Sequence, residues 1–145
     1  MNLERRVAKV SDEDFIRTTY KSAYYGATLR QLGKCDDALL DGYFDRKWIP
    51  EKFEVIVKEG EPCGFLSVEL HIDHIFLSEL VVSPENQGLG IGTRILKDEI
   101  NKAHDTRLPI RLRVLKQSRA IDLYKRNGFR QYNESENQIL MEWSG

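Results

Sequence analysis

The sequence contains only two cysteines, Cys35 and Cys63, among its 145 residues. So few thiols exclude a disulfide framework, and their spacing matches no paired-cysteine metal site, so we expect both to be reduced and no metal to be bound. No apolar run approaches the ~20 residues that a membrane helix needs. The charged N-terminus also lacks the apolar segment of a signal peptide. We therefore expect a cytoplasmic protein with no membrane partner.

Neither sign of charge dominates, because 22 basic residues face 23 acidic ones, for a net charge of −1. An excess of positive charge is what lets a protein hold nucleic acid electrostatically. We therefore expect no nucleic-acid partner, and a nucleic-acid-binding or interaction domain is the least favoured of three hypotheses.

Linkers, repeats and low-complexity stretches are also absent, which predicts a single domain over residues 1–145. Ser11 with Asp14 has the spacing of a helix N-cap, and Asp36 is the expected cap of a second helix. The expected strands are 3–10, 53–58, 63–70, 75–82, 110–114, 129–132 and 139–143, with helical spacing after 11, 36, 91 and 120. The strand over 75–82 is apolar on both faces apart from Ser78 and Glu79, which predicts a central strand covered on two sides. The order indicates a mixed α/β fold.

Three glycines, Gly88, Gly90 and Gly92, stand at alternate positions where this strand ends and a helix begins near Ile91. Glycine allows positive φ and close approach, so successive N–H groups can face one anion at the positive end of a helix. A dinucleotide fingerprint would need glycine where Thr93 stands, and the ending of a P-loop is absent. The spacing therefore predicts a phosphate-binding loop of another kind, with a tight turn that binds nothing as the alternative.

The segment from Val82 to Gly92, which includes Gln87 and Gly90, resembles the acyl-CoA-binding motif of the GNAT N-acetyltransferase superfamily, Gln/Arg-x-x-Gly-x-Gly/Ala after a strand. The segment Ala120-Ile-Asp-Leu-Tyr-Lys-Arg-Asn-Gly-Phe129 is similar to a second motif of that family. The expected order of elements matches the family from about Leu3 to Trp143. The chain departs from the family by having Gln117 and Ser118 where an asparagine is usual.

The resemblance implies a GNAT-like fold, in which a mixed and mostly antiparallel central sheet is splayed at the strand ending near Val82, with helices on both faces. Acetyl-CoA would lie in the opening between this strand and the strand over 110–114. The residues implied to bind it are Leu80, Val81, Val82, Gln87, Gly88, Gly90, Ile91, Gly92, Thr93, Gln117, Ser118, Ala120 and Tyr124. The activity implied is transfer of an acetyl group to a primary amine of a small molecule, peptide or protein by direct attack in a ternary complex.

Tyr124 is the implied acid for the leaving thiol, because the matching family tyrosine lies beside the CoA sulfur; the alternative is an ordinary core aromatic. Glu79 is the candidate base, as the only carboxylate in the splayed strand. It could instead pair structurally with Arg111 or Arg113. His74 is the second candidate base, and bulk water or simple positioning is a further alternative.

The amine is implied to approach from the side opposite CoA, where Tyr24, Tyr25, Arg30 and Gln31 are candidates to shape a pocket, with an exposed helix face as the alternative. The second hypothesis for the whole chain is a non-catalytic acyl-CoA-binding or sensory module. A homodimer is compatible with either reading.

Overall fold

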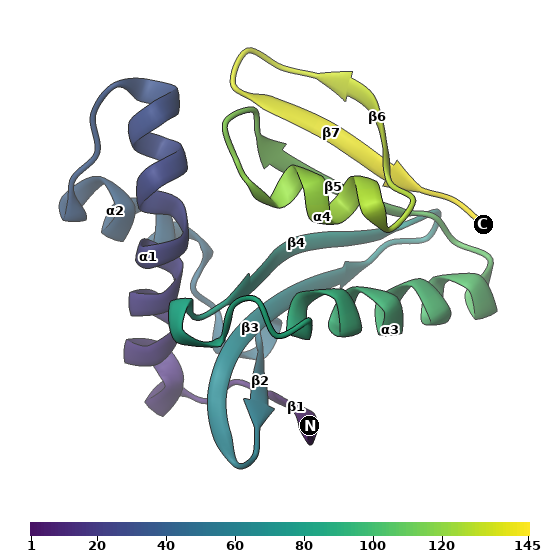
Figure 1. The fold of residues 1–145 in the computed structure, drawn as a ribbon, viewed down its shortest axis with the longest axis horizontal. Helices are drawn as coiled ribbons and strands as arrows, with labels where there is room; N and C mark the ends of the chain where they lie inside the picture. The colour runs from purple at the N-terminus through teal and green to yellow at the C-terminus, as the bar shows by residue number, and fades with distance from the viewer.

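A seven-stranded sheet in the order β1-β2-β3-β4-β5-β7-β6 forms the centre of the computed structural model, which describes residues 1–145 (Figure 1). The strands are β1 Leu3–Val7, β2 Glu54–Lys58, β3 Glu61–Leu70, β4 Ile75–Val82, β5 Ile110–Leu115, β6 Arg130–Glu134 and β7 Gln138–Trp143. The helices are α1 Glu13–Leu32, α2 Asp37–Lys47, α3 Ile91–Thr106 and α4 Ala120–Arg126, with short 3₁₀ turns at Val10–Asp12, Pro50–Lys52 and Pro84–Asn86. The predicted order of elements is confirmed.

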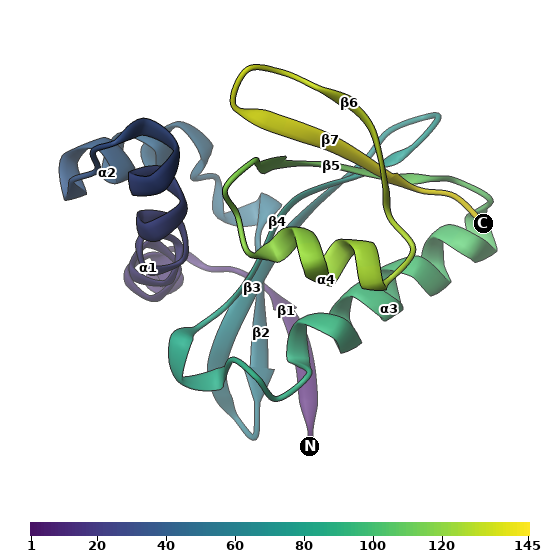
Figure 2. The ribbon, with the colours of Figure 1, turned by 45° about the horizontal axis from the view of Figure 1, so that its top comes forward.

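Helices cover both faces of the sheet, as Figures 1 and 2 show. Residues of α1 and α2 pack on one face around Phe44, Phe53 and Phe65. On the other face, α3 packs through Ile95 and Leu96. The predicted fold class, a mixed sheet between helices, is confirmed. None of the helices combines the length and the apolar character that a bilayer span requires.

The sheet is splayed between its fourth and fifth strands. β4 and β5 are the only parallel neighbours, and they pair only at Ile75 with Ile110 and at Phe76 with Arg111. By contrast, β4 pairs with β3 along its whole length. Beyond Phe76 the two strands separate, so the remainder of β4 has a free edge toward β5. The predicted opening at the end of β4 is therefore present.

A β-bulge in β4 reverses the side-chain alternation of this strand. Ser67 of β3 pairs with Glu79, but its neighbour Val68 pairs with Leu77, so Ser78 is an extra residue. Alternate residues of a regular strand point to one face. Here Leu77 packs in the cluster on the α3 side, whereas Glu79 contacts α1 and α2. The bulge thus turns Glu79 toward the first two helices.

The first helix begins differently from the prediction. The first strand ends at Val7 rather than residue 10, a 3₁₀ turn follows, and α1 begins at Glu13. Ser11 and Asp14 therefore do not form the expected N-cap. The Asp12 carboxylate instead accepts a hydrogen bond from the Lys9 amide at 2.8 Å and is held by Arg6 at 2.8 Å, which lowers the pKa of Asp12 to about 2. This ion pair holds the residue that directly precedes the helix.

The remaining boundaries lie closer to the prediction. The other strands begin and end within two residues of the expected positions, and β4 matches at both ends. The carboxylate of Asp36 accepts a hydrogen bond from the Leu39 amide at 2.9 Å, so the predicted cap of α2 is confirmed. The α1 helix continues through Leu32, and Gly33 at φ +78° ends it.

Gly64 is required where β3 passes β4, because a Cβ atom at this position would lie 2.4 Å from the Val81 carbonyl oxygen. We expect Gly64→Ala to lower the free energy of unfolding by about 1–3 kcal/mol, the usual cost of overpacking. The matched control is Gly42→Ala in α2, where an added Cβ has no neighbour within 4 Å. It should instead gain about 0.5–1 kcal/mol from helix propensity. Thermal or urea unfolding of both variants checks this; equal stabilities would contradict it.

Candidate active site

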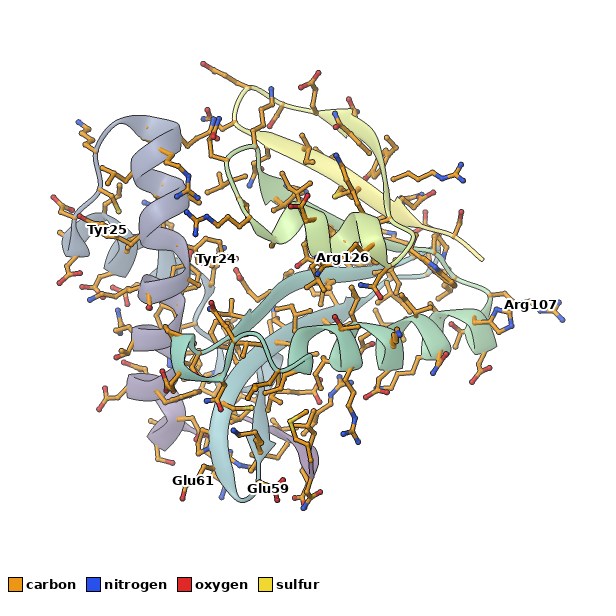
Figure 3. The ribbon with its side chains drawn as sticks, in the orientation of Figure 1. Tyr24, Tyr25, Glu59, Glu61, Arg107 and Arg126 are labelled. Atoms are coloured by element: carbon orange, nitrogen blue, oxygen red, sulfur yellow. The ribbon has the colours of Figure 1, made fainter.

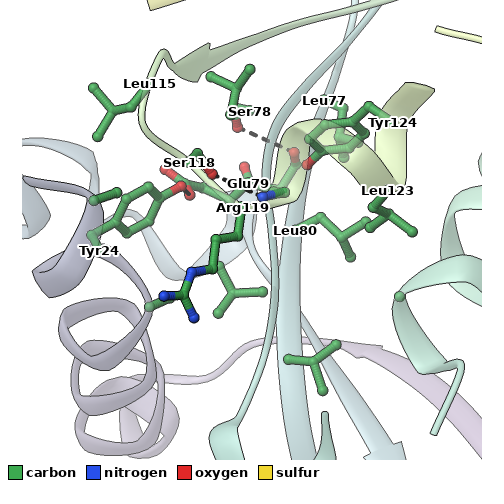
Figure 4. A pocket seen from close by; sticks show the side chains of 18 of the residues that line it. Tyr24, Leu77, Ser78, Glu79, Leu80, Leu115, Ser118, Arg119, Leu123 and Tyr124 are labelled. Carbon is green, nitrogen blue, oxygen red and sulfur yellow. Dashed lines mark hydrogen bonds between the residues drawn. The ribbon is translucent and has the colours of Figure 1, made fainter. Parts of the chain in front are cut away.

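A cleft of about 1290 Å³ opens where β4 and β5 separate. Its walls come from α1, the ends of β4 and β5, the N-terminus of α3 and the beginning of α4, and Figure 4 shows it from close by. Glu79 and all of the residues implied to bind acetyl-CoA, except Gln117, line this cleft. Gln117 does not line the cleft; its carbonyl oxygen accepts a hydrogen bond at 2.9 Å from Arg30, which does.

The glycine loop presents the N-terminus of α3 to the cleft. Gly88 and Gly90 have φ values of +80° and +82°, and Gly90 is the N-cap residue of α3. The first amides of a helix have no partner within it, and no acidic side chain occupies the first turn of α3. An added Cβ at either glycine would have no neighbour within 4 Å, so the loop faces open space. This end of the cleft can hold an anion.

Gln87 has a role in holding this loop. Its side-chain amide donates a hydrogen bond to the Val82 carbonyl oxygen at 3.0 Å. Val82 ends β4 beyond the last residue that pairs with β5. The Gln87 side chain therefore satisfies a carbonyl group at the end of the splayed strand and ties the loop to β4.

Glu79 lies at the centre of the cleft and is only 3% exposed. The Tyr24 hydroxyl donates a hydrogen bond to its Oε2 at 2.5 Å, and Lys47 Nζ lies 2.8 Å from its Oε1. The predicted structural partners were wrong, because Arg111 binds Glu142 at 2.8 Å and Arg113 stacks over the Phe76 ring. The bulge in β4 explains the difference, since it turns the carboxylate toward α1 and α2 and away from β5.

Two tyrosines face Glu79 from opposite sides. Figure 4 shows Tyr24 on α1 and Tyr124 on α4 with Glu79 between them. Tyr124 is 6% exposed and packs edge-on against Phe129, so it also serves as the core residue that the alternative interpretation described. Burial, and then the negative charge of Glu79, raise the pKa of Tyr124 well above its usual value. The same two causes raise the pKa of Tyr24. Both phenols are therefore proton donors at neutral pH.

A second cavity of about 480 Å³ adjoins the cleft on the side of α1 and α2. It is lined by Tyr20, Tyr24, Thr28, Gln31, Leu32, Tyr43, Arg46, Lys47, Leu115 and the 135–138 segment. The Gln31 amide donates to Asn137 Oδ1 at 3.3 Å, while Gln31 Oε1 is buried without a partner. Tyr24 and Lys47 line both this cavity and the cleft, so they stand at the boundary between the two spaces.

The four candidate residues for an acceptor pocket do not all reach these spaces. Tyr24 lines both, Arg30 lines the cleft and Gln31 lines the second cavity. Tyr25 lines neither space and is 46% exposed, and Figure 3 shows it on the other side of α1 from Tyr24.

His74 lies outside the cleft. It directly precedes Ile75, the first residue of β4, where β4 and β5 are still paired. Its ring contacts Asp73 at 2.7 Å and stacks on the ring of His71. His74 therefore lies in the turn before β4, and it does not line the cleft.

The sequence did not single out Lys47, although it completes the centre of the site. Leu40, Phe44 and Lys47 lie at positions i, i+4 and i+7 of α2, and such residues share one helix face. A cation that continues an apolar stripe is a signal for a buried carboxylate partner. Because that partner is 32 residues away on β4, the spacing alone could not identify it.

Residues 50–131 match the family described as "Acetyltransferase (GNAT) domain". No protein of curated function matches the sequence. Among solved structures, the PaiA N-acetyltransferase from Thermoplasma acidophilum in complex with coenzyme A is 18% identical with a TM-score of 0.80, and all of both chains is covered. YjaB from Escherichia coli, in its apo-form, is also 18% identical, with a TM-score of 0.77 over 100% of this chain and 99% of that one. Ard1 from Thermoplasma volcanium is 19% identical, with a TM-score of 0.68 over 99% and 98%. At these identities the structures establish a shared fold.

Proposed function

The chain belongs to the GNAT family of acetyltransferases, and from this premise we propose how its cleft transfers an acetyl group from acetyl-CoA to a primary amine. The transfer takes place within one domain of residues 1–145, by direct attack of the amine in a ternary complex. One observation carries the proposal: a buried carboxylate, a buried phenol and a free helix N-terminus line the same cleft at the end of a splayed strand.

The donor lies along the glycine loop and the free edge of β4. Its pyrophosphate accepts hydrogen bonds from the amides of residues 87–93 at the N-terminus of α3. The main chain of Leu80, Val81 and Val82, unpaired toward β5, meets the pantetheine and the thioester carbonyl. Such preorganised N–H groups stabilise the oxyanion that forms when the amine attacks. Ser118 and Ala120, on the opposite wall of the cleft, flank the pantetheine arm.

The amine occupies the second cavity and reaches the thioester past Tyr24 and Lys47. An amine of pKa ~10.4 is neutral at pH 7 only at a cost of about 4.6 kcal/mol, so a proton acceptor is useful. Glu79 takes that proton, directly or through a water molecule. The amine nitrogen then forms a bond to the thioester carbon, and the C–S bond breaks as CoA leaves. The nitrogen loses its second proton as the amide forms, and this proton replaces the one that Tyr124 gives to the thiolate.

Tyr124 protonates the departing thiolate. The phenol is protonated at neutral pH, as a general acid must be before the thiol leaves, but its raised pKa makes it a weaker acid than an ordinary phenol, so its contribution is small. Holding both substrates side by side supplies a further ~7–11 kcal/mol, so positioning contributes more than either proton transfer.

The activity is tested by measuring thiol release from acetyl-CoA across a panel of primary amines, including amino acids, polyamines and peptide N-termini. An amine-dependent thiol release with an acetylated product supports transfer. Tight CoA binding without amine-dependent release from any member of the panel would favour the non-catalytic acyl-CoA-binding module.

We expect Gly90→Val to weaken CoA binding by about tenfold or more, because it removes the positive φ that aims the loop amides at the pyrophosphate. Gly60→Val is the matched control: Gly60 has φ +83° and open space around it, but it lies in the β2–β3 turn. Both variants should lose stability, whereas only Gly90→Val should change the calorimetric Kd for CoA. Equal Kd values in the two variants would place the pyrophosphate elsewhere.

Tyr124→Phe should leave the Kd for CoA nearly unchanged and lower kcat toward the small end of the ~10²–10⁴ range typical of a general acid. The loss is small because a thiol of pKa ~8.5 leaves fairly well without protonation. Steady-state kinetics at saturating acetyl-CoA measures this effect. An unchanged kcat would return Tyr124 to the packing role that its contact with Phe129 also supports.

Glu79→Gln should depress kcat/KM most at pH 7 and progressively less as the pH rises, because the ~4.6 kcal/mol cost of amine deprotonation shrinks by about 1.36 kcal/mol per pH unit. The control is Glu99→Gln, which also changes a buried carboxylate; Glu99 lies on α3, pairs with Arg5 of β1 and does not line this cleft. It should lower the Tm without changing the pH profile. A pH-independent loss in Glu79→Gln would remove Glu79 from the proton transfer.

A further inference from the structure

Glu79 is held by side chains from two different helices. Lys47, the last residue of α2, contacts Oε1, and Tyr24 of α1 contacts Oε2. The Lys47 ammonium also lies 5.4 Å from the ring centre of Tyr20 and 5.9 Å from that of Tyr24. These contacts fix the ammonium over the carboxylate although half of the Lys47 side chain, 48%, is exposed.

Lys47 places a positive charge 2.8 Å from the buried carboxylate of Glu79. A buried carboxylate without a partner is strongly disfavoured and binds a proton instead. The phenols of Tyr20, Tyr24 and Tyr124 also face Glu79 and are neutral when protonated, and its β3 neighbour is the uncharged Ser67. Other charged residues line the same cleft, among them Lys52, Glu69, Arg113 and Arg119, but the ion pair of Glu79 is with Lys47. Lys47 therefore supplies the one positive charge in contact with Glu79.

The charge of Lys47 is itself stable. Burial tends to lower the pKa of Lys47, but attraction to Glu79 and the contact with Tyr20 outweigh that tendency, so the pKa is raised. The ammonium form is thus present throughout the neutral range.

We propose that Lys47 is a positioning residue for the acetyl transfer: its ammonium group keeps the Glu79 carboxylate ionised and oriented at the entrance from the second cavity. An amine that arrives from this cavity then meets a proton acceptor and not a neutral acid. The kinetic consequence rests on the assignment of Glu79 as the base. The electrostatic consequence, ionisation of Glu79, does not depend on that assignment.

The electrostatic part is tested by NMR titration of the Glu79 carboxyl carbon in the full chain. In Lys47→Met the midpoint should rise by about one pH unit or more relative to the parent, because an opposite charge in contact has been removed. Lys47→Arg keeps the charge and should restore the parent midpoint.

The matched control is Lys21→Met. Lys21 is likewise a lysine in ion pairs, with Asp37 and Asp41 of α2, but it has no contact with Glu79, so the midpoint should not move. A midpoint in Lys47→Met within a few tenths of the parent overturns the proposal, and Lys47→Gln gives the same test if the methionine variant does not fold.

The kinetic part uses the pH dependence of kcat/KM with the best amine of the panel. Protonation of the base makes kcat/KM fall more steeply at low pH than amine protonation alone requires. In Lys47→Met this steeper region should begin about one pH unit higher, with the Kd for CoA unchanged. An equal loss at every pH in Lys47→Met, in a protein whose Glu79→Gln variant does show the pH-dependent loss, indicates a packing role and overturns the proposal. If instead Glu79→Gln shows the pH-independent loss while the NMR midpoint moves as expected, the base assignment fails and the electrostatic role of Lys47 stands.

Discussion

The separation of β4 from β5 after Phe76 is the constraint on which the rest of the site depends. Backbone N–H and C=O groups inside a sheet need partners, and a strand that leaves its neighbour releases a row of them. At Val82 the Gln87 side chain supplies a partner from within the chain, whereas the preceding residues face the cleft. The same separation lets α3 point its N-terminus into the opening, so an anion-binding end and an unpaired strand edge lie within one cleft.

A single extra residue then decides which face receives the carboxylate. Without the bulge at Ser78, Glu79 would point to the same face of the sheet as Leu77. Its carboxylate would then enter the cluster on the α3 side, which consists of hydrophobic residues. With the bulge it meets Lys47 and Tyr24. Burying an ion pair contributes little net stability by itself. The presence of this ion pair on a central strand therefore agrees with the role proposed for Glu79 in the reaction.

Features set by neighbouring residues in the sequence could be predicted. Contacts that depend on how strands pair and how helices end could not. The glycine loop could be predicted because a strand end, alternate glycines and a helix start lie within 14 residues, and β4 itself was bounded correctly. The partners of Glu79 could not be predicted, because a bulge in β4 and the end of α2 together determine them. The start of α1 was misplaced because Ser11 looked like a cap while Arg6 had already engaged the next residue, Asp12.

In the proposed mechanism, donor and acceptor lie on opposite faces of the sheet, and this division has a mechanistic consequence. The part of the cleft assigned to the donor is lined by α3, α4 and the edge of β4, whereas Tyr24 and Lys47 come from α1 and α2. Those two helices are held together by Arg17, which pairs with Asp41 and Asp45 and lies over the ring of Phe44. Any change in their packing that reshapes the second cavity also moves the two partners of Glu79. The proposed mechanism therefore couples the choice of amine to the removal of its proton through one pair of helices, while binding of acetyl-CoA can stay unchanged.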